Sequence, residues 1–593
     1  MTELIKGGAF LLGPVDENTV FTPEDFDDFH LMIKKTSYDF MKNQVEPKID
    51  EIEEMAEGVT IGLMKKAGEI GLLGSDVQEE YGGEGADKIT TMIIAENASS
   101  FSGSFAAAFG AHTGIGTLPI VYFGTEEQKK KYLPGLATGE MIAAYALTEP
   151  EAGTDSLNCK TKAVLSDDGK FYILNGAKQY ITNASWADVI VTYAKIDGER
   201  FTAFIVDADS EGVSIDPEEK KMGIKGSSTC SVIFENAKVP VENMLWQEGK
   251  GHQVAFNILN IGRFKLGPGS VGGSKKTLEF ASEYALQRIQ FKQPIAQFNI
   301  IKNKFANMTI LTYIMESMVY RIAGMMEDIL NEVKDTGGGT AEVMAAIQEY
   351  VIECSSSKVF CSEALDYIAD EGVQILGGYG YSQEYPAERL YRDSRINRIF
   401  EGTNEINRIL IPGTLMRKAM KQELPFMEAV MGLGGELAKL KEAKIPESSP
   451  EREEFYLANM KLLFILAAGN AAQKFGEDLL KEQEVLCRLA DMAMQILAAE
   501  SGLLRAKKMM AAGESNDSKL AFKMTQCFIH EMVPKLELWA KEVIAATLEE
   551  EAASKAYSGI RLLTQFEPMN TFAPKREIAD ALYECKKYFL DRS

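Results

Sequence analysis

The chain has 593 residues, a formal net charge of −24, and 25% charged and 46% hydrophobic residues. This length leaves room for several domains of about 150 residues each, and the negative charge argues against nucleic acid and against electrostatic attachment to anionic lipid. Seven cysteines without CxxC spacing and four scattered histidines predict neither a disulfide framework nor a metal site. With no leader-like or membrane-spanning pattern, we expect a cytoplasmic protein in a reducing compartment.

Residues 1–140 are predicted to form a helical N-terminal domain. Thr22-Pro23-Glu24-Asp25 has the N-cap and Pro-at-N1 pattern of a helix start. Apolar residues then recur at helical spacing through residues 26–52. Gly124-Thr125-Glu126-Glu127 is a further cap signal before another helical stretch.

Residues 141–250 are predicted to form a middle domain, an antiparallel, barrel-like β-sheet. Short runs rich in β-branched and aromatic residues replace the helical spacing here. Asp167-Asp168-Gly169 and Asp197-Gly198 are hairpin turn signals. The expected strands cover residues 160–165, 171–175, 189–194, 201–206 and 231–234.

Helical spacing returns over residues 251–420, which are predicted to form a helical bundle containing one helix from about 340 to 376. Residues 421–593 are predicted to be an appended helical domain that follows a linker-like segment at 445–454. Its expected helices cover residues 455–471, 484–508, 519–546 and 578–589.

The stretch 374–405 carries the most specific pattern in the chain. Gly377-Gly378 lets the backbone approach a ligand closely, and Phe400-Glu401-Gly402 places a carboxylate at a tight break before a new apolar run. Glu401 is a candidate general base, because desolvation raises the pKa of a carboxylate from about 4.3 towards neutral pH. Taken alone, the run from Glu401 to Asn404 is more typical of a helix cap.

Two other elements have the composition of ligand-binding loops. Residues 145–156 and 180–183 combine hydroxyls, backbone donors and an aromatic ring, which suits a flat ligand with polar edges, although a capped loop is favoured on this segment alone. Arg288 has a guanidinium that can hold phosphate oxygens in a bidentate fork. A surface ion pair is the commoner role of an isolated arginine.

The order of these residues resembles the acyl-CoA dehydrogenase family over about residues 20–415. The matching motifs are Leu147-Thr148-Glu149-x-x-x-Gly153-Thr154-Asp155, Arg288-x-Gln290-Phe291-x-x-Pro294-Ile295-x-x-Phe298, and Gln374-x-x-Gly377-Gly378-x-Gly380-Tyr381 followed by Arg398-Ile-Phe-Glu-Gly-Thr-Asn404. The chain departs from the usual motif at Tyr180, where many relatives have Trp, and at Lys292, where Gly is usual. Its extra C-terminal length resembles the very-long-chain branch, whose added domain supports dimerisation and can touch membranes. Ordinary core packing is the simpler explanation of its apolar stripes.

The resemblance implies a mainly α fold with a β-domain, FAD as cofactor and no metal. The flavin contacts that it implies are Tyr145, Leu147, Thr148, Tyr180, Ile181, Thr182, Arg288, Gln290, Phe291, Phe298, Gln374, Leu376, Gly377, Gly378, Thr403 and Glu405. The implied substrate contacts are Thr154, Asn260, Arg263 and Gly402. In the family the Arg288 element meets the Gln374 segment of a neighbouring subunit around one flavin, which implies a homodimer or tetramer.

The implied reaction converts a long-chain acyl-CoA to trans-2-enoyl-CoA in fatty-acid β-oxidation. Glu401 takes the α-proton, the β-hydrogen leaves as hydride to flavin N5, and electrons pass to an electron-transfer flavoprotein. Some relatives carry the base beside Arg263, but Gly262 stands there and cannot serve. An acyl-CoA oxidase that uses oxygen and a catalytically silent assembly scaffold of the same fold are the alternatives.

Overall fold

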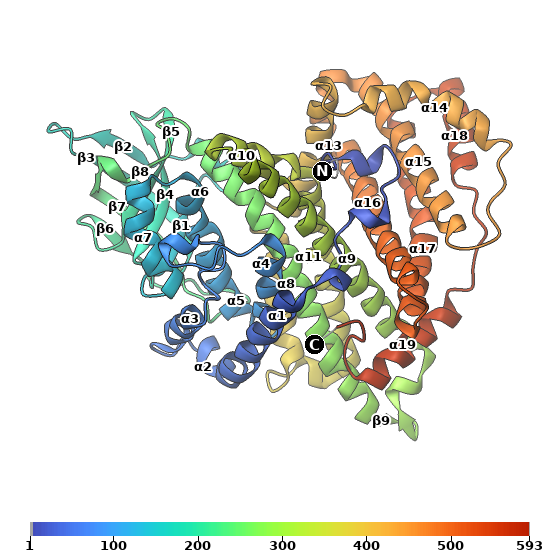
Figure 1. The fold of residues 1–593 in the computed structure, drawn as a ribbon, viewed down its shortest axis with the longest axis horizontal. Coiled ribbons are helices and arrows are strands. Elements are labelled where there is room, and N and C mark those ends of the chain that lie inside the picture. The colour runs from blue at the N-terminus through green and yellow to red at the C-terminus, as the bar shows by residue number, and fades with distance from the viewer. Residues whose placement is uncertain (1–3, 592–593) are drawn as a thin grey trace.

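The structure is a computed structural model that describes residues 4–591. It is mainly helical, with one β-sheet domain at one end, a central helical bundle, and an appended helical domain at the other end (Figure 1). Thr22 caps only a short 3-10 turn, Pro23–Asp25, and the first α-helix begins at Asp28, where the Asp27 side chain accepts from the His30 N–H. The N-terminal helices are α1 (Asp28–Phe40), α2 (Ile49–Glu53), α3 (Val59–Glu69), α4 (Lys88–Ala98), α5 (Gly103–Gly110), α6 (Leu118–Phe123) and α7 (Glu126–Thr138).

The sheet domain is mainly antiparallel, in the order β6-β7-β3-β2-β4-β5-β8. β4 also makes parallel pairings with β2 and with β1, a short strand that the sequence did not predict because Ala143–Ala146 lacks β-branched residues. The strands are β1 (Ala143–Ala146), β2 (Lys162–Leu165), β3 (Phe171–Thr182), β4 (Val189–Ile196), β5 (Arg200–Asp207), β6 (Val213–Ile215), β7 (Thr229–Pro240) and β8 (Met244–Leu245). β1 leads directly into the Leu147 loop, and β3 ends at Thr182.

The central bundle is built around two long neighbouring helices, α8 and α11. The single helix expected over residues 340–376 is two helices, because Tyr350 leaves helical geometry (φ −102°, ψ 28°) and donates its buried hydroxyl to the Ile5 carbonyl. The bundle helices are α8 (Gly251–Gln287), α9 (Asn299–Asp335), α10 (Thr340–Glu349), α11 (Val351–Leu376), α12 (Pro386–Ser394) and α13 (Asn404–Met420). A small hairpin of β9 (Ile289–Gln290) and β10 (Gln293–Pro294) joins α8 to α9.

The appended domain packs its helices against α9, α11 and α13 of the bundle. Its helices are α14 (Phe426–Leu440), α15 (Glu451–Phe475), α16 (Gln483–Ala511), α17 (Asn516–Thr547), α18 (Glu550–Leu563) and α19 (Phe572–Cys585). The sequence did not predict α14 and α18. Two segments are long and apolar enough to span a membrane, 103–123 and 451–481, but 78% and 72% of their apolar windows are buried inside the fold. Burial of this extent is expected of helices that pack in the core of a folded domain.

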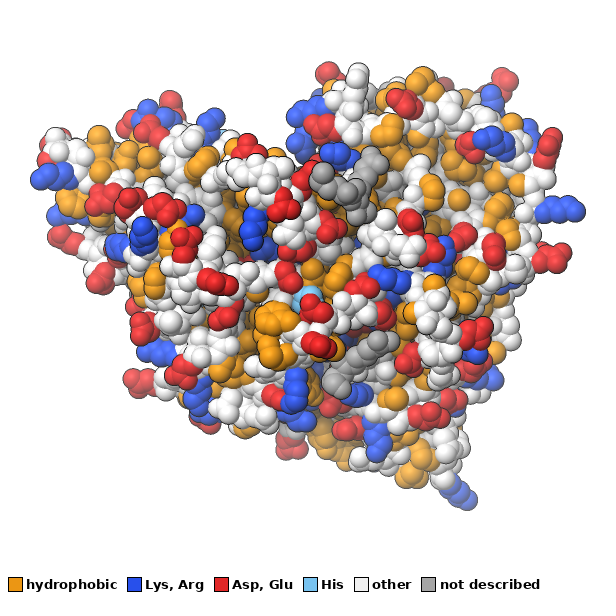
Figure 2. Space-filling model, in the orientation of Figure 1, with side chains coloured by type: hydrophobic (Ala, Val, Ile, Leu, Met, Phe, Trp, Pro, Cys, Tyr) orange, Lys and Arg blue, Asp and Glu red, His pale blue; other side chains and the backbone are white. Residues whose placement is uncertain are grey.

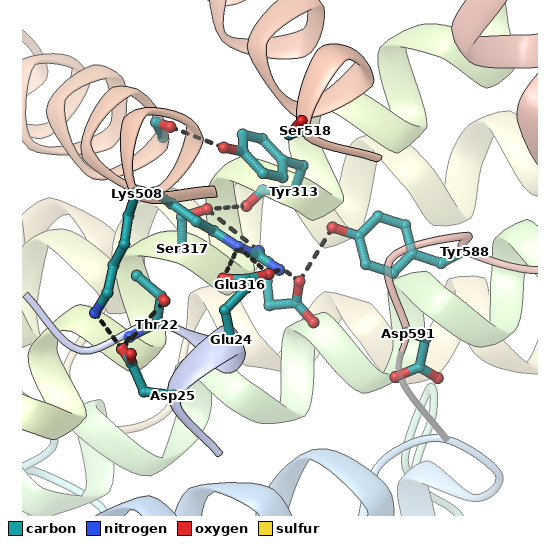
Figure 3. A network of polar contacts seen from close by, with 12 residues as sticks. Thr22, Glu24, Asp25, Tyr313, Glu316, Ser317, Lys508, Ser518, Tyr588 and Asp591 are labelled. Carbon is teal, nitrogen blue, oxygen red and sulfur yellow. Dashed lines mark hydrogen bonds and ion pairs between the residues drawn. The ribbon is translucent and has the colours of Figure 1, made fainter. Parts of the chain in front are cut away.

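Buried charges join the appended domain to the bundle (Figure 3). Arg505 on α16 is fully buried and donates to Glu316 Oε2 at 2.6 Å and to Glu24 Oε1 at 2.9 Å. Tyr588 donates to the same Glu316 oxygen at 3.0 Å. The pKa of Glu316 is held below its ordinary value, although burial opposes this, because Lys275 and Arg505 lie beside it.

The face of the molecule seen in Figure 2 mixes acidic and basic side chains, with a notch between the lobes of the sheet domain and the appended domain.

Candidate active site

Glu401 lies in a tight turn between α12 and α13, where two successive residues have left-handed backbone geometry. Glu401 has φ 57° and Gly402 has φ 82°. A non-glycine residue in this region costs roughly 1–3 kcal/mol, so surrounding contacts must hold it there. Thr403 is the N-cap of α13, and its hydroxyl accepts from the Ile406 N–H at 3.3 Å. The cap role that the isolated motif favoured for Glu401 therefore belongs to Thr403.

Three side chains hold the turn through its backbone carbonyls. Arg263 Nε on α8 donates to the Glu401 carbonyl at 3.2 Å. The Gly402 carbonyl accepts from Lys358 Nζ on α11 and from Asn407 Nδ2 on α13, each at 2.8 Å. These contacts fix the backbone of the turn and leave the Glu401 carboxyl group without a role in holding it.

The Glu401 carboxyl group faces α8 at the edge of a cavity. Its Oε2 is buried and has no hydrogen-bond partner in the part of the chain that the structure describes. The carboxyl rests against Gly262, where a Cβ atom would overlap Oε2. Burial raises the pKa of Glu401 from its ordinary value to about 7, and the positive charges of Arg263 and Lys358 partly oppose this rise. A carboxylate with these properties suits a general base that works near neutral pH.

A narrow cavity of about 190 Å³ begins at Glu401 and passes between α4, α5, α8 and α12. Along α8 its lining runs from Gly262 to Gly273, a length of about 16 Å at 1.5 Å per residue. Much of the wall is made of small residues, which leave room for a slender apolar ligand. They include Ala95, Ala98, Gly103, Ala106, Ala107, Gly110, Ala111, Gly114, Gly269 and Gly273.

The predicted flavin loops of the sheet domain lie at this cavity. Thr182, at the end of β3, lines the cavity together with Glu401. The Gln179 N–H donates to the Thr148 carbonyl at 2.9 Å, which joins the two loops. Tyr180 is 59% exposed with φ 59°. An exposed aromatic ring two residues before the cavity-lining Thr182 is suited to packing on a flat ligand.

A buried ion pair supports the Leu147 loop from below. Lys178 Nζ donates to Glu149 Oε1 at 2.8 Å and to the Leu147 carbonyl at 3.4 Å. Both charged side chains are buried. Burial lowers the pKa of Lys178 below its ordinary value, and the adjacent Glu149 opposes that change.

A second, wider groove of about 640 Å³ lies at the other end of α11. Arg288, Gln290, Leu376, Gly377 and Gly378 line it, with the Arg288 guanidinium 5.6 Å from the centre of the Tyr379 ring. A Cβ at either glycine would meet only open space. The structure thus brings the Arg288 element and the Gly377 segment together in one chain. The sequence expectation that placed them on different subunits is wrong in this respect.

Phe291 and Phe298 lie close to this groove. Phe291 is 88% exposed, and the centres of the two rings are 6.1 Å apart in an edge-to-face contact. Tyr145 is buried on β1 and packs edge-to-face on Tyr193, with ring centres 5.4 Å apart. Ile181 is buried in the sheet core, and Gln374 lies in the last turn of α11. Of the predicted flavin residues, Thr182 lines the Glu401 cavity, and Arg288, Gln290, Leu376, Gly377 and Gly378 line the second groove.

Six residues that the resemblance assigned to the flavin or to the substrate have the following settings in the structure. Asn260 is buried and donates to the Ile347 carbonyl at 2.7 Å, and it does not line the cavity. Thr154 is exposed on the loop after β1, and Glu405 is exposed in the first turn of α13. Thr403 uses its hydroxyl as a cap, as described above. Arg263 donates to the Glu401 carbonyl, and Gly402 is part of the turn itself. Their roles in binding substrate stay predictions.

Sequence reasoning missed two residues that shape the site, Lys358 and the space left by Gly262. The available signal for Lys358 was a lysine in an otherwise uncharged part of a helix, residues 354–362, where a buried charge needs a partner. Gly262 was recognised only as unable to act as a base. The structure shows that it makes room for the carboxyl of Glu401.

Four family models match the chain. They are the acyl-CoA dehydrogenase N-terminal domain over residues 27–140, the middle domain over 144–237, the C-terminal domain over 249–416, and a further acyl-CoA dehydrogenase C-terminal domain over 459–561. A probable acyl-CoA dehydrogenase of Bacillus subtilis (strain 168) is 50% identical over 98% of this chain and 98% of its own length. The mitochondrial very long-chain specific acyl-CoA dehydrogenase of Macaca fascicularis is 34% identical, over 81% of this chain and 76% of that protein.

A solved structure is similarly close. The crystal structure of an acyl-CoA dehydrogenase complexed with FAD from Bacillus anthracis has a TM-score of 0.96 at 50% identity, over 98% of this chain and 100% of that chain. The fold and the site thus define a flavoprotein that oxidises acyl thioesters. The chain belongs to the acyl-CoA dehydrogenase family, and its cofactor is FAD.

The residues present fit FAD. The exposed Tyr180 and the Thr148 loop offer an aromatic face and backbone groups beside the Glu401 cavity. At the second groove, the open sides of Gly377 and Gly378 allow close approach to backbone, and Arg288 supplies positive charge suited to a diphosphate.

Proposed function

We propose that this enzyme converts long-chain acyl-CoA to trans-2-enoyl-CoA in fatty-acid β-oxidation, with Glu401 as the catalytic base. The observation that carries the proposal is the carboxyl group of Glu401, which lies at one end of a narrow cavity and whose Oε2 is buried without a hydrogen-bond partner among residues 4–591. Few structural roles require a glutamate there, because the contacts that hold the turn use backbone carbonyls.

In the proposed mechanism, Glu401 removes the α-proton of the bound thioester. Its free Oε2 can accept that proton without first breaking another hydrogen bond. With a pKa of about 7, Glu401 is substantially ionised at neutral pH and still basic enough to take a proton from carbon when the thioester is polarised. FAD, when bound, supplies the centre that accepts the β-hydrogen as hydride. An acyl chain that fills the cavity displaces water and keeps the carboxylate reactive.

The length of the cavity supports a long-chain substrate. Its lining follows α8 for about 16 Å and is walled largely by glycine and alanine. A saturated chain extended over that distance is a long-chain acyl group. The similarity to a very long-chain specific dehydrogenase supports the same substrate class.

The separation of the two sites supports a homodimer or a tetramer. Lys358 contacts the catalytic turn, whereas Leu376 on the same helix lines the second groove. These positions are 18 residue steps apart on α11, which corresponds to about 27 Å. This distance exceeds the span from ring to diphosphate within one FAD, so a flavin seated at Glu401 requires the groove of a second copy.

We place the enzyme in the cytoplasm and expect an electron-transfer flavoprotein to take up the electrons from the reduced flavin.

Anaerobic titration tests this function. The FAD-loaded protein is mixed with butyryl-, octanoyl- and palmitoyl-CoA, and bleaching of the flavin is followed by absorbance. We expect palmitoyl-CoA to bleach fastest. Absence of bleaching with all three would overturn the dehydrogenase proposal. Rapid recolouring in air of the substrate-reduced enzyme would replace the dehydrogenase with an oxidase.

A further inference from the structure

Lys358 is a buried lysine whose ammonium group is directed at the catalytic turn. It is fully buried on α11. Its Nζ donates to the Gly402 carbonyl at 2.8 Å and to Asn404 Oδ1 at 2.6 Å. These two acceptors lie one and three residues after the catalytic base. A single cation therefore spans the turn from Gly402 to the start of α13.

The acceptor side chain of Asn404 is itself fixed. Asn404 Nδ2 donates to Glu363 Oε1 and to Ser362 Oγ, both at 3.1 Å. Arg408 binds Glu363 through two hydrogen bonds, of 2.7 and 2.8 Å. Its Nε donates to Asp491 on α16, also at 2.8 Å. Lys358 thus binds a rigid partner that is connected to the appended domain.

Charged groups on four elements act on Lys358: the catalytic turn, α13, α11 itself and α8. Glu401 and Glu405 face it from the turn and α13, Glu363 from α11 itself, and Arg263 from α8. Burial lowers the pKa of Lys358 from its ordinary value to about 7, and the negative charge of Glu401 opposes this change. Glu401 likewise feels the positive charges of Arg263 and Lys358. Protonation of Lys358 and ionisation of Glu401 therefore favour each other.

Burying an ammonium group is costly, and an apolar side chain of similar length would fill the same space without that cost. Neither acceptor depends on Lys358 alone, because Asn407 also donates to the Gly402 carbonyl and Ser362 also donates to Asn404 Oδ1. What the lysine adds is a positive charge and a geometric constraint beside Glu401.

We propose that Lys358 is a positioning residue for the catalytic base: its ammonium group holds the turn in the left-handed geometry that directs Glu401 into the cavity, and it places positive charge behind the carboxylate. This inference rests on the proposed role of Glu401. Arg263 holds the other side of the same turn through the Glu401 carbonyl.

The test is the substitution Lys358→Met in the FAD-loaded enzyme, which keeps an unbranched side chain of similar length and removes the charge and the donors. We measure the anaerobic rate of flavin bleaching by saturating palmitoyl-CoA as a function of pH. The rate should fall by about 100-fold, as expected when a reacting group is displaced by about 1 Å. The pH midpoint of the rate should rise by about one unit, because Glu401 loses a stabilising positive charge.

The matched control is Lys461→Met, which removes another buried lysine, one that binds the Gly13 carbonyl and Glu500 away from the site. It should alter thermal stability but leave the pH midpoint unchanged. Lys358→Gln, which retains a neutral donor, should recover part of the rate while keeping the raised midpoint. This variant also provides the readout if Lys358→Met fails to retain FAD.

The results separate two kinds of failure. If acyl-CoA does not bleach the wild-type enzyme, the proposed function fails. If the wild type is bleached and the Lys358 variants keep its rate and midpoint within twofold and 0.2 pH unit, roughly the limits of such assays, the positioning role alone is overturned.

Discussion

The substitution Glu401→Gln separates the chemical role of this side chain from its structural cost. Glutamine has nearly the same shape as a protonated glutamic acid, so the turn and the cavity wall should persist. The variant should retain bound FAD and lose bleaching by acyl-CoA, because an amide cannot take a proton from carbon at neutral pH. It should also be more stable than the wild type at alkaline pH.

The size of that gain follows from the pKa shift. Glu401 rises from 4.5 to about 7 on folding, so the folded protein binds the proton more tightly than the unfolded chain. The associated stability is fully present below pH 4.5 and is lost as the pH rises through 7. Integrating over this shift, the free energy of unfolding of Glu401→Gln should exceed that of wild type by about 3 kcal/mol at pH 8 and by about 1 kcal/mol at pH 5.

Thermal unfolding of the two FAD-loaded proteins measures this difference. For a chain of 593 residues, 3 kcal/mol corresponds to a Tm increase of about 2–3 °C. Glu428→Gln, at an exposed position on α14, is the control and should leave Tm unchanged at both pH values. The reasoning is refuted if Glu401→Gln is bleached as fast as wild type, or if its gain in Tm is no larger at pH 8 than at pH 5.

Three further changes test the cavity, the domain contact and the flavin groove. A Cβ at Gly269 would already lie 2.8 Å from a serine oxygen across the cavity, so the side chain of Gly269→Val would narrow the cavity. Bleaching by palmitoyl-CoA should slow at least tenfold, while bleaching by butyryl-CoA is little affected. If palmitoyl-CoA still bleaches the variant faster than butyryl-CoA does, the cavity assignment is contradicted. Arg505→Met leaves Glu24 and Glu316 without their buried cation and should lower the free energy of unfolding by about 3–5 kcal/mol, measured as a fall in Tm of about 2–4 °C. The control is Lys439→Met, at an exposed position. Equal Tm values for Arg505→Met and wild type would show that the network contributes little to stability. Arg288→Met should weaken FAD binding by about tenfold or more, measured by flavin fluorescence during dilution, and unaltered retention of FAD would remove Arg288 from the cofactor site.

The catalytic turn was predictable because the residues that identify it are consecutive in the sequence. Glu401 stands between an apolar residue and a glycine, and the ordered motif around it is long enough to outweigh the simpler reading as a cap. The long helices of the bundle and of the appended domain were predictable for a similar reason, since their apolar spacing persists over many turns. α16 and α17 extend only a few residues beyond the ranges expected from the sequence.

The contacts that complete the site join residues that are distant in sequence. Gly262 and Lys358 reach Glu401 from two different helices, and local spacing carries no information about such a meeting. The same limitation applies to Thr403, whose cap role became clear only from the direction of its hydroxyl. The break at Tyr350 was missed because it depends on a bond to the distant Ile5 carbonyl.

The interface between the bundle and the appended domain contains buried ion pairs as well as apolar contacts. These ion pairs affect whether the two parts can fold independently. Separating them would expose Arg505 and strand the carboxylates of Glu24 and Glu316 in an interior built around their opposite charge. Although the segment before α15 looks like a natural place to divide the protein, we expect neither half to be stable by itself, because each would lose these buried ion pairs. The added helices belong to one cooperative body with the catalytic machinery, and an enzyme shortened at that point should lose solubility before it loses any single catalytic step.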